Sequence, residues 1–416
     1  MVAFEKFQLD NGLRVMVNRD TTTLVAAVNI LYDVGARDEN PEKTGFAHLF
    51  EHLMFGGSIN IPNYDSPLQM AGGENNAFTS NDITNYYITL PVNNLETAFW
   101  LESDRMLSLA FSQRSLDVQR NVVIEEYRQR YLNQPYGDVW LLLRPLAYKV
   151  HPYNWNTIGK NIKHIEDATM EEVKSFFKKF YCPNNAILSV SGNVETEEIK
   201  QLCEKWFLPI PKGQVNPRNL PMEPLQNEKR FLEVERPVPV DAIYKAFHIC
   251  KRGDEKFYAT DIISEILSRG NSSRLYQNLV KEKKIFSEID AYLSGDLDEG
   301  LFIISGKPSM GVTLEDAEKA IDLEIEKIKQ ETVKERELQK VKNKIESTLL
   351  FGEISVLNKA MNLAMFELMG NASMVNEEVE RYLSVTPEKI KSVANEIFIE
   401  NNSSVLYYRA SGKKGN

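Results

Sequence analysis

Two histidines and a glutamate lie within one short apolar segment, Gly45–Gly57, which reads GFAHLFEHLMFGG. His48 and His52 are four residues apart, so on a helix of 3.6 residues per turn their side chains project side by side. Two imidazoles with a third protein ligand, and a fourth position left to water, form a catalytic zinc arrangement. Glu51, one residue before His52, can accept a proton from water on the metal without being a ligand itself. The inverted motif H-x-x-E-H therefore predicts a zinc site with hydrolytic chemistry and Glu51 as its general base.

The other residues of this segment are apolar on every side, which is typical of a buried helix. Burying two imidazoles and a carboxyl group without partners would be costly. The alternative is a pair of core histidines that hydrogen-bond to the backbone. That interpretation fits poorly, because the chain has only five histidines and two fall in this window. The other three, His151, His164 and His248, are isolated in the sequence, and we interpret them as structural.

A third ligand is expected from another element. Glu126 follows the apolar run Val122–Ile124 and comes 74 residues after His52. Its neighbour Glu125 is the alternative, because a helix can present only one of two adjacent residues to a given point.

The elements that must position these residues alternate between β-rich and helical stretches. Residues 6–34 look like a hairpin, with a turn at Asp10-Asn11-Gly12, followed by a further strand. Residues 83–91 are another β-rich run. Helices are expected at about 93–110 and 113–132, and as charged stretches around 314–348.

The chain divides into two similar halves. Residues 168–188 match residues 385–405 at a shift of 217, which places Thr169 on Thr386 and the pair Asn184-Asn185 on Asn401-Asn402. In both copies a threonine can cap a helix, and an Asn-Asn turn precedes a strand. The sequence predicts an α+β protein of two homologous α/β half-domains, each a mostly antiparallel sheet flanked by helices.

The domain boundary is expected at a stretch rich in proline and polar residues, Phe207–Asn227. It predicts a catalytic zinc-binding domain at 1–206, a linker at 207–228, and a homologous non-catalytic domain at 229–416.

HLFEH followed by VVIEE resembles the pitrilysin/insulinase family of zinc metallopeptidases, the inverzincins. The match is closest to the branch of two-domain subunits that includes the mitochondrial processing peptidase and its bacterial relatives. It covers essentially the whole chain, including the LDNGLRV opening and the ENNAFTSNDITNYY segment. The resemblance implies that Glu126, the second glutamate of VVIEE, ligates zinc (Zn2+) with His48 and His52, and that Glu51 is the general base.

The resemblance also implies an edge strand beside the zinc, formed by Asn76, Ala77, Phe78 and Thr79. Peptide substrate would add to this edge as an extra strand held by main-chain hydrogen bonds. The alternative for this segment is an ordinary transition from loop to strand.

The sequence departs from the family pattern in two places. Gln119 stands where the family usually has a glutamate, one heptad before Glu126, which puts a carboxylate role there in doubt. In the second half, Val280 and Ser287 stand where self-sufficient members carry an arginine and a tyrosine that bind substrate. Either Arg274 and Tyr276 take over this role, or a homologous second subunit that lacks the zinc motif supplies the donors. We expect a heterodimer of this chain with such a subunit, and a homodimer is the alternative.

The function expected from these observations is that of a zinc-dependent endopeptidase. It would hydrolyse peptides and unfolded segments that are bound in extended form inside a clamshell chamber. The alternatives are a non-catalytic structural or assembly subunit of the same family, and a peptide-binding module with a structural metal. The last fits poorly, because structural zinc is normally closed by four protein ligands, often cysteines, and no cysteine lies near the motif.

The composition argues against several other classes of protein. The net charge of −10 disfavours binding to nucleic acid, because phosphate contact needs a basic surface. No apolar run approaches the roughly 20 residues that span a bilayer. The first residues contain no apolar export segment, so a cytoplasmic location is expected, or a periplasmic one if a signal peptide has been removed. The three cysteines, Cys182, Cys203 and Cys250, are odd in number and contain no CxxC pair, which argues against a disulfide framework.

Overall fold

The computed structural model describes residues 1–214 and 217–412 of the 416-residue chain. These residues form two compact units, each assembled from three stretches of chain. The first unit comprises Met1–Gln129, Trp155–Leu220 and Leu349–Glu377. The second comprises Arg130–Asn154, Pro221–Thr348 and Glu378–Asn416. Among the described residues, no helix combines the length and the apolar composition that crossing a bilayer requires.

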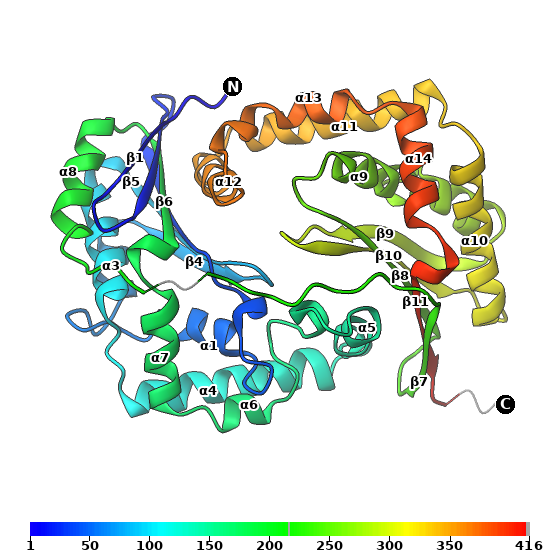
Figure 1. Cartoon of the computed structure of the whole chain (residues 1–416), viewed down its shortest axis with the longest axis horizontal. Helices are drawn as coiled ribbons and strands as arrows, with labels where there is room; N and C mark the ends of the chain where they lie inside the picture. The colour runs from blue at the N-terminus through cyan, green and yellow to red at the C-terminus, as the bar shows by residue number, and fades with distance from the viewer. Residues whose placement is uncertain (215–216, 413–416) are drawn as a thin grey trace. The chain divides into compact units, whose positions relative to one another are not determined.

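The first unit is built on a six-stranded sheet in the order β1-β2-β6-β3-β5-β4 (Figure 1). All neighbouring strands are antiparallel except β2 and β6, which run parallel. Nearly all side chains of the central strands β3 and β6 are buried, because helices cover both faces of the sheet. The strands are β1 (Glu5–Gln8), β2 (Arg14–Arg19), β3 (Val25–Tyr32), β4 (Glu74–Thr79), β5 (Thr84–Pro91) and β6 (Ala186–Gly192).

Helices α3 and α8 lie on one side of this sheet and α12 on the other (Figure 1). The helices of the first unit are α1 (Phe46–Leu53), α2 (Asp65–Met70), α3 (Leu95–Leu107), α4 (Gln113–Tyr127), α6 (Lys163–Glu166), α7 (Met170–Phe180), α8 (Thr196–Trp206) and α12 (Val356–Leu368).

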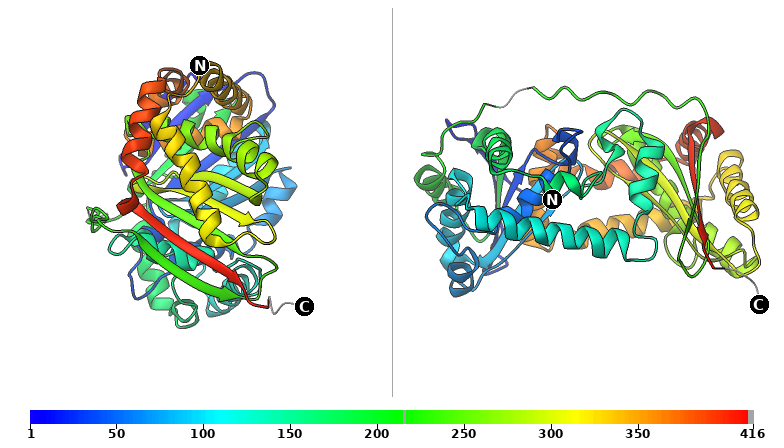
Figure 2. Two further views of the ribbon diagram at one scale, coloured as in Figure 1. Left: turned by 90° about the vertical axis from the view of Figure 1, so that its right-hand side faces the viewer. Right: turned by 90° about the horizontal axis from the view of Figure 1, so that it is seen from below.

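The second unit is built on a five-stranded sheet in the order β7-β11-β8-β10-β9. Figure 2 (left) looks onto this sheet, where the red strand β11 runs alongside the green strand β7. Strands β7 and β11 are parallel and the remaining pairs are antiparallel. The strands are β7 (Arg230–Arg236), β8 (Ala242–Lys251), β9 (Phe286–Ser294), β10 (Glu299–Pro308) and β11 (Ser403–Ala410).

One face of the second sheet is covered by α5, and α9, α10 and α14 also pack against its strands. The helices of this unit are α5 (Val139–Ala147), α9 (Glu255–Ser268), α10 (Leu314–Gln330), α13 (Glu378–Leu383), α14 (Pro387–Ile397) and α11 (Glu335–Gly352), which runs from the second unit into the first.

The predicted duplication is confirmed by the strand order and by the helix caps. Thr169 caps α7 by accepting a hydrogen bond from the Glu172 N–H, and Thr386 caps α14 in the same way through the Lys389 N–H. Asn185 donates its side-chain amide to the carbonyl of Phe180 at 2.9 Å, and Asn402 makes the equivalent bond at 2.9 Å. The same local interactions therefore end α7 and α14 and lead into the strands that follow them, β6 and β11.

The two units differ from the predicted division into 1–206 and 229–416 in two segments. Residues 130–154 belong to the second unit, and residues 349–377 belong to the first. The reason is burial: each sheet has an apolar face that is covered by a helix from the other half. Leu143 of α5 packs into the core beneath β8, β10 and β11, and Leu363 of α12 packs against β2, β3 and β6.

The predicted linker, 207–228, is divided between the two units at Leu220. Residues 215 and 216 within it lie outside the described residues. Arg218 joins the linker to the first unit, because its guanidinium lies 3.0 Å from a carboxylate oxygen of Asp33 and 2.6 Å from one of Asp38. The three cysteines are free thiols, in agreement with the prediction from their number.

Candidate metal centre

Helix α1 carries the two histidines and is held by apolar contacts on most of its surface. Phe46, Ala47, Leu49, Phe50 and Leu53 are buried. The helix lies against α4, β4 and α7, and the ring of Phe50 stacks on Phe176 and Tyr181 from the α7 region. The side chains of His48 and His52 are 12% and 25% exposed, so their face of the helix is only partly accessible to solvent. The burial of the apolar faces agrees with the prediction, although the helix ends at Leu53, before the two glycines.

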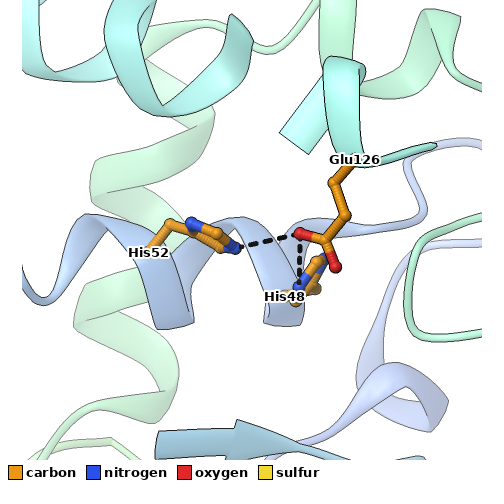
Figure 3. A group of neighbouring side chains, drawn as sticks. All are labelled: His48, His52 and Glu126. Carbon is orange, nitrogen blue, oxygen red and sulfur yellow. Dashed lines mark ion pairs between the residues drawn. The ribbon is translucent and has the colours of Figure 1, made fainter. Parts of the chain in front are cut away.

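Glu126, on α4, meets both histidines (Figure 3). One of its carboxylate oxygens lies 3.6 Å from Nε2 of His48 and 3.5 Å from Nε2 of His52. One ligand atom from each of the three residues falls within 4.8 Å of the others. Ligands about 2.1 Å from a tetrahedral zinc ion lie roughly 3.4 Å apart. The nitrogen and oxygen donors therefore fit a zinc ion in type and in spacing, and three protein ligands are the number that a catalytic zinc site uses.

The neighbouring glutamate points elsewhere. Glu125 is 54% exposed, and its carboxylate accepts a hydrogen bond from the side chain of Gln129 at 2.9 Å. The structure therefore brings Glu126, and not Glu125, to the histidines. Gln119 is half-buried on the same helix, one heptad before Glu126.

Glu51 lies on α1 between the two histidines in sequence and is held by the edge of the sheet. Its Oε2 accepts a hydrogen bond from the hydroxyl of Thr79, on β4, at 2.6 Å. Burial raises the pKa of the Glu51 carboxyl, and the hydrogen bond from Thr79 opposes that rise. Sequence reasoning included Thr79 only as part of the strand that receives substrate. Its contact with Glu51 depends on how β4 packs against α1, and no pattern in the local sequence indicates that packing.

The four residues of the predicted substrate strand all lie in β4, which is the last strand of its sheet and pairs only with β5. Asn76 and Phe78 are exposed, whereas Ala77 and Thr79 are half-buried on the side of α1. The main-chain N–H of Ala77 donates to the side-chain oxygen of Asn76 at 2.8 Å. This donor is therefore used by its own neighbour and not by β5.

A buried ion pair behind the site was also missed by sequence reasoning. Glu102 and Arg105, three residues apart on α3, are each 1% exposed and bind one another through several hydrogen bonds. The guanidinium lies over the rings of Tyr86 and Tyr64, 4.4 and 4.7 Å from their centroids. The spacing of the two charges was visible in the sequence, but their burial was not.

The other three histidines hydrogen-bond to backbone groups away from the candidate metal centre. His151 Nδ1 accepts the N–H of Tyr153, His164 Nδ1 accepts the N–H of Thr44, and His248 Nε2 bonds to the carbonyl of Ala147. Within the described part of the chain, His48, His52 and Glu126 form the one group of three or more such side chains that could hold a metal ion.

Two sequence models of one peptidase family match most of the chain. The model described as "Insulinase (Peptidase family M16)" matches residues 14–153, and "Peptidase M16 inactive domain" matches residues 167–345. The chain belongs to the insulinase family of peptidases. The family predicted from the motifs is thereby confirmed.

The similarity to relatives of the insulinase family extends over nearly the whole chain. Zinc protease PqqE of Helicobacter pylori is 29% identical over 411 residues, which cover 97% of this chain and 92% of that protein. Mitochondrial-processing peptidase subunit beta of Saccharomyces cerevisiae is 29% identical over 210 residues, 50% of this chain and 45% of that protein. A solved structure of a protease from Helicobacter pylori superimposes with a TM-score of 0.92 at 28% identity, covering 98% of this chain and 100% of that one. These matches confirm the predicted α+β fold of two halves.

Of the positions that depart from the insulinase-family pattern, Gln119 lies on α4 in the first unit, and Val280 and Ser287 lie in the second unit. Val280 is half-buried in a π-helical stretch, Tyr276–Glu282, and the hydroxyl of Ser287 donates to the carbonyl of Lys307 at 3.0 Å. Of the alternative pair of donors, Arg274 is bound to the carboxylate of Glu337 at 2.7 and 3.0 Å, and Tyr276 is half-buried at the start of the π-helical stretch.

Proposed function

We propose that the chain is a zinc-dependent endopeptidase that acts on peptides and unfolded segments bound in extended form. The observation that carries this proposal is the convergence of Glu126, from α4, with His48 and His52 next to Glu51 on α1, a helix whose apolar side chains are buried. A scaffold has no need for three metal donors, two imidazoles and a carboxylate, beside a second carboxyl group.

The chain's own groups have separable roles in this reaction. His48, His52 and Glu126 would hold the zinc ion. When bound there, zinc polarises the peptide carbonyl and makes water more acidic. Thr79 holds Oε2 of Glu51, which leaves Oε1 to take the proton from the attacking water and later to give it to the leaving amine.

The edge of β4 would receive the substrate. An extended peptide that pairs with this edge makes main-chain hydrogen bonds whatever its sequence. The Ala77 N–H now donates to Asn76, so a substrate carbonyl would replace the Asn76 side chain there. Phe78, which is 41% exposed, and Asn76 would contact alternate side chains of the peptide. A folded protein cannot offer a free strand of this kind, which favours unfolded substrates.

We also propose that a homologous second subunit without the zinc motif supplies further substrate contacts. Val280 and Ser287 offer neither a positive charge nor a phenol, and Arg274 is engaged with Glu337. Cleavage that requires a sister chain would support a heterodimer. Full activity of a homodimer purified from this gene alone would contradict it.

The proposed function is tested by hydrolysis of a library of unfolded peptides with and without a chelator. Wild type, Glu51→Gln and Glu126→Gln would be compared, with Glu125→Gln as the matched control on the same helix. We expect Glu51→Gln to keep zinc but lose at least about a hundredfold in kcat. Glu126→Gln should lose zinc as well, whereas Glu125→Gln should behave as the wild type. A zinc-loaded wild type that cleaves nothing, alone or with a sister chain, would favour the non-catalytic subunit instead.

A further inference from the structure

The N-terminal end of α1 has no capping side chain of its own. Its N-cap residue is Gly45, at φ 90°, a conformation that favours glycine. The first N–H groups of any helix lack partners within the helix. Here they are satisfied from outside: Glu39 accepts the Gly45 N–H on Oε2 at 2.9 Å and the Ala47 N–H on Oε1 at 2.8 Å. Glu39 is 5% exposed, so this cap is shielded from water.

The carboxyl group of Glu39 is itself held by Trp155. The indole N–H of Trp155 donates to Glu39 Oε2 at 3.0 Å and to the carbonyl of Ala36 at 2.9 Å. Burial raises the pKa of Glu39 to about 8, and its three N–H donors act in the opposite direction. Trp155 is 3% exposed, and it is the residue at which the chain re-enters the first unit.

The same returning stretch, Trp155–His164, also fixes the residue that precedes Gly45. The Lys160 N–H donates to the hydroxyl of Thr44 at 2.8 Å, and His164 Nδ1 accepts the Thr44 N–H at 3.0 Å. Thr44 is fully buried. The loop that leads into α1 is therefore bound at two points by a segment more than 100 residues away.

We propose that Glu39 is a positioning residue for the metal centre. By holding the first turn of α1, it fixes the place and rotation of the helix at which His48 and His52 meet Glu126. Glu39 accepts the N–H of Ala47, the residue directly before His48, and it acts on the ligand through the helix. Groups that orient metal ligands without touching the metal typically change affinity by 10- to 100-fold when they are replaced. This inference rests on the proposed zinc site.

The variant Glu39→Gln tests the proposal with no change in size. Both oxygens of Glu39 accept N–H donors, whereas a glutamine has one oxygen and one NH2 group. In Glu39→Gln the NH2 group would therefore face an N–H donor that has lost its acceptor. We expect the Kd for Zn2+ to rise by about tenfold or more, measured on metal-stripped protein by competition with a chromophoric chelator. The absorption spectrum of the cobalt-substituted variant should change as well, because it reports ligand geometry.

The matched control is Asp254→Ala, which removes the carboxylate that caps α9 in the second unit by accepting the Lys256 N–H at 2.8 Å. It should lower the melting temperature but leave the Kd for Zn2+ unchanged. If Glu39→Gln does not fold, Trp155→Phe removes one donor to Glu39 and should raise the Kd to a smaller extent.

Three results would overturn the proposal: wild-type zinc affinity in folded Glu39→Gln, unchanged affinity in Trp155→Phe when Glu39→Gln does not fold, or an equal loss in Asp254→Ala. Failure of the wild type to bind zinc would instead overturn the proposed function together with this inference.

Discussion

At the scale of single residues, the proposed general base, Glu51, is held by a contact between a helix and a strand. Thr79 donates to Glu51 at 2.6 Å and comes from the strand on which substrate is proposed to bind. Thr79→Val keeps the shape of the side chain and removes the hydroxyl. We expect kcat to fall about tenfold or more with little change in KM or in zinc content, because Glu51 loses its orientation.

Thr79→Ser restores the hydroxyl and should restore most of kcat. Steady-state kinetics together with metal analysis separates this role from a general effect on folding. Thr79→Val with the kcat of the wild type would show that Glu51 needs no partner on β4.

A second residue-scale prediction concerns acid stability. Glu318 is 9% exposed and accepts hydrogen bonds from Lys229, Lys245 and Tyr407, and these contacts lower its pKa to about 2. The folded pKa lies below the ordinary value near 4.5, so this stabilisation is present above about pH 4.5 and is lost as pH falls towards 2. Urea unfolding should show that Glu318→Gln costs about 2 kcal/mol less at pH 3 than at pH 7.

The control for this titration is Glu315→Gln on the same helix. Glu315 is 52% exposed and pairs with Arg409, so solvent screens its interaction. Its substitution should have a small effect at both pH values. A cost of Glu318→Gln that stays constant from pH 7 to pH 3 would contradict the prediction.

At the scale of elements, each sheet depends on a helix encoded in the other half. Leu363 of α12 and Leu143 of α5 are both completely buried, one in each unit. Truncating either to alanine should cost about 2–5 kcal/mol. We expect Leu363→Ala to reduce hydrogen-exchange protection in β2, β3 and β6, which are encoded far from it, and Leu143→Ala to reduce protection in β8 and β11. Loss of protection confined to the half that carries each substitution would contradict the exchange of helices.

Most elements and the HxxEH part of the candidate metal site were predictable from the sequence, because their signals are local. The stretches 93–110 and 113–132 form α3 and α4, and the Asp10-Asn11-Gly12 turn joins β1 to β2. The choice between Glu125 and Glu126 needed the family resemblance, because residues alone left both open. The exchange of α5 and α12 could not be predicted, since an apolar helix face does not specify which sheet it covers. Glu39 and Trp155 were missed for a similar reason, because their contact joins segments 116 residues apart.

At the scale of the whole chain, one shift relates the two halves almost throughout. A shift of 217 residues carries β3 onto β8, α5 onto α12, α7 onto α14 and β6 onto β11, to within a few residues. It also places α1 within the region of α9, which contacts β9 and α14 as α1 contacts β4 and α7. At the positions equivalent to the four site residues His48, Glu51, His52 and Glu126, the second half carries Glu265, Ser268, Arg269 and Asn343. The second half thus has no imidazole at these positions and no carboxyl group at the equivalents of Glu51 and Glu126, which supports placing the candidate metal site in the first half.

The exchanged helices lead to a prediction for the chain cut in two. A fragment of residues 1–220 lacks α12, and a fragment of residues 221–416 lacks α5, so each would expose an apolar sheet face to water. Independent domains would fold separately, whereas exchanged helices require both fragments at once. We therefore expect each fragment alone to aggregate or to unfold without cooperativity, as seen by circular dichroism and gel filtration. Co-expressed fragments should instead elute together and bind Zn2+ with the affinity measured for the intact chain, if the proposed site is correct. A fragment 1–220 that unfolds cooperatively and binds zinc alone would show that α12 is dispensable to the first unit.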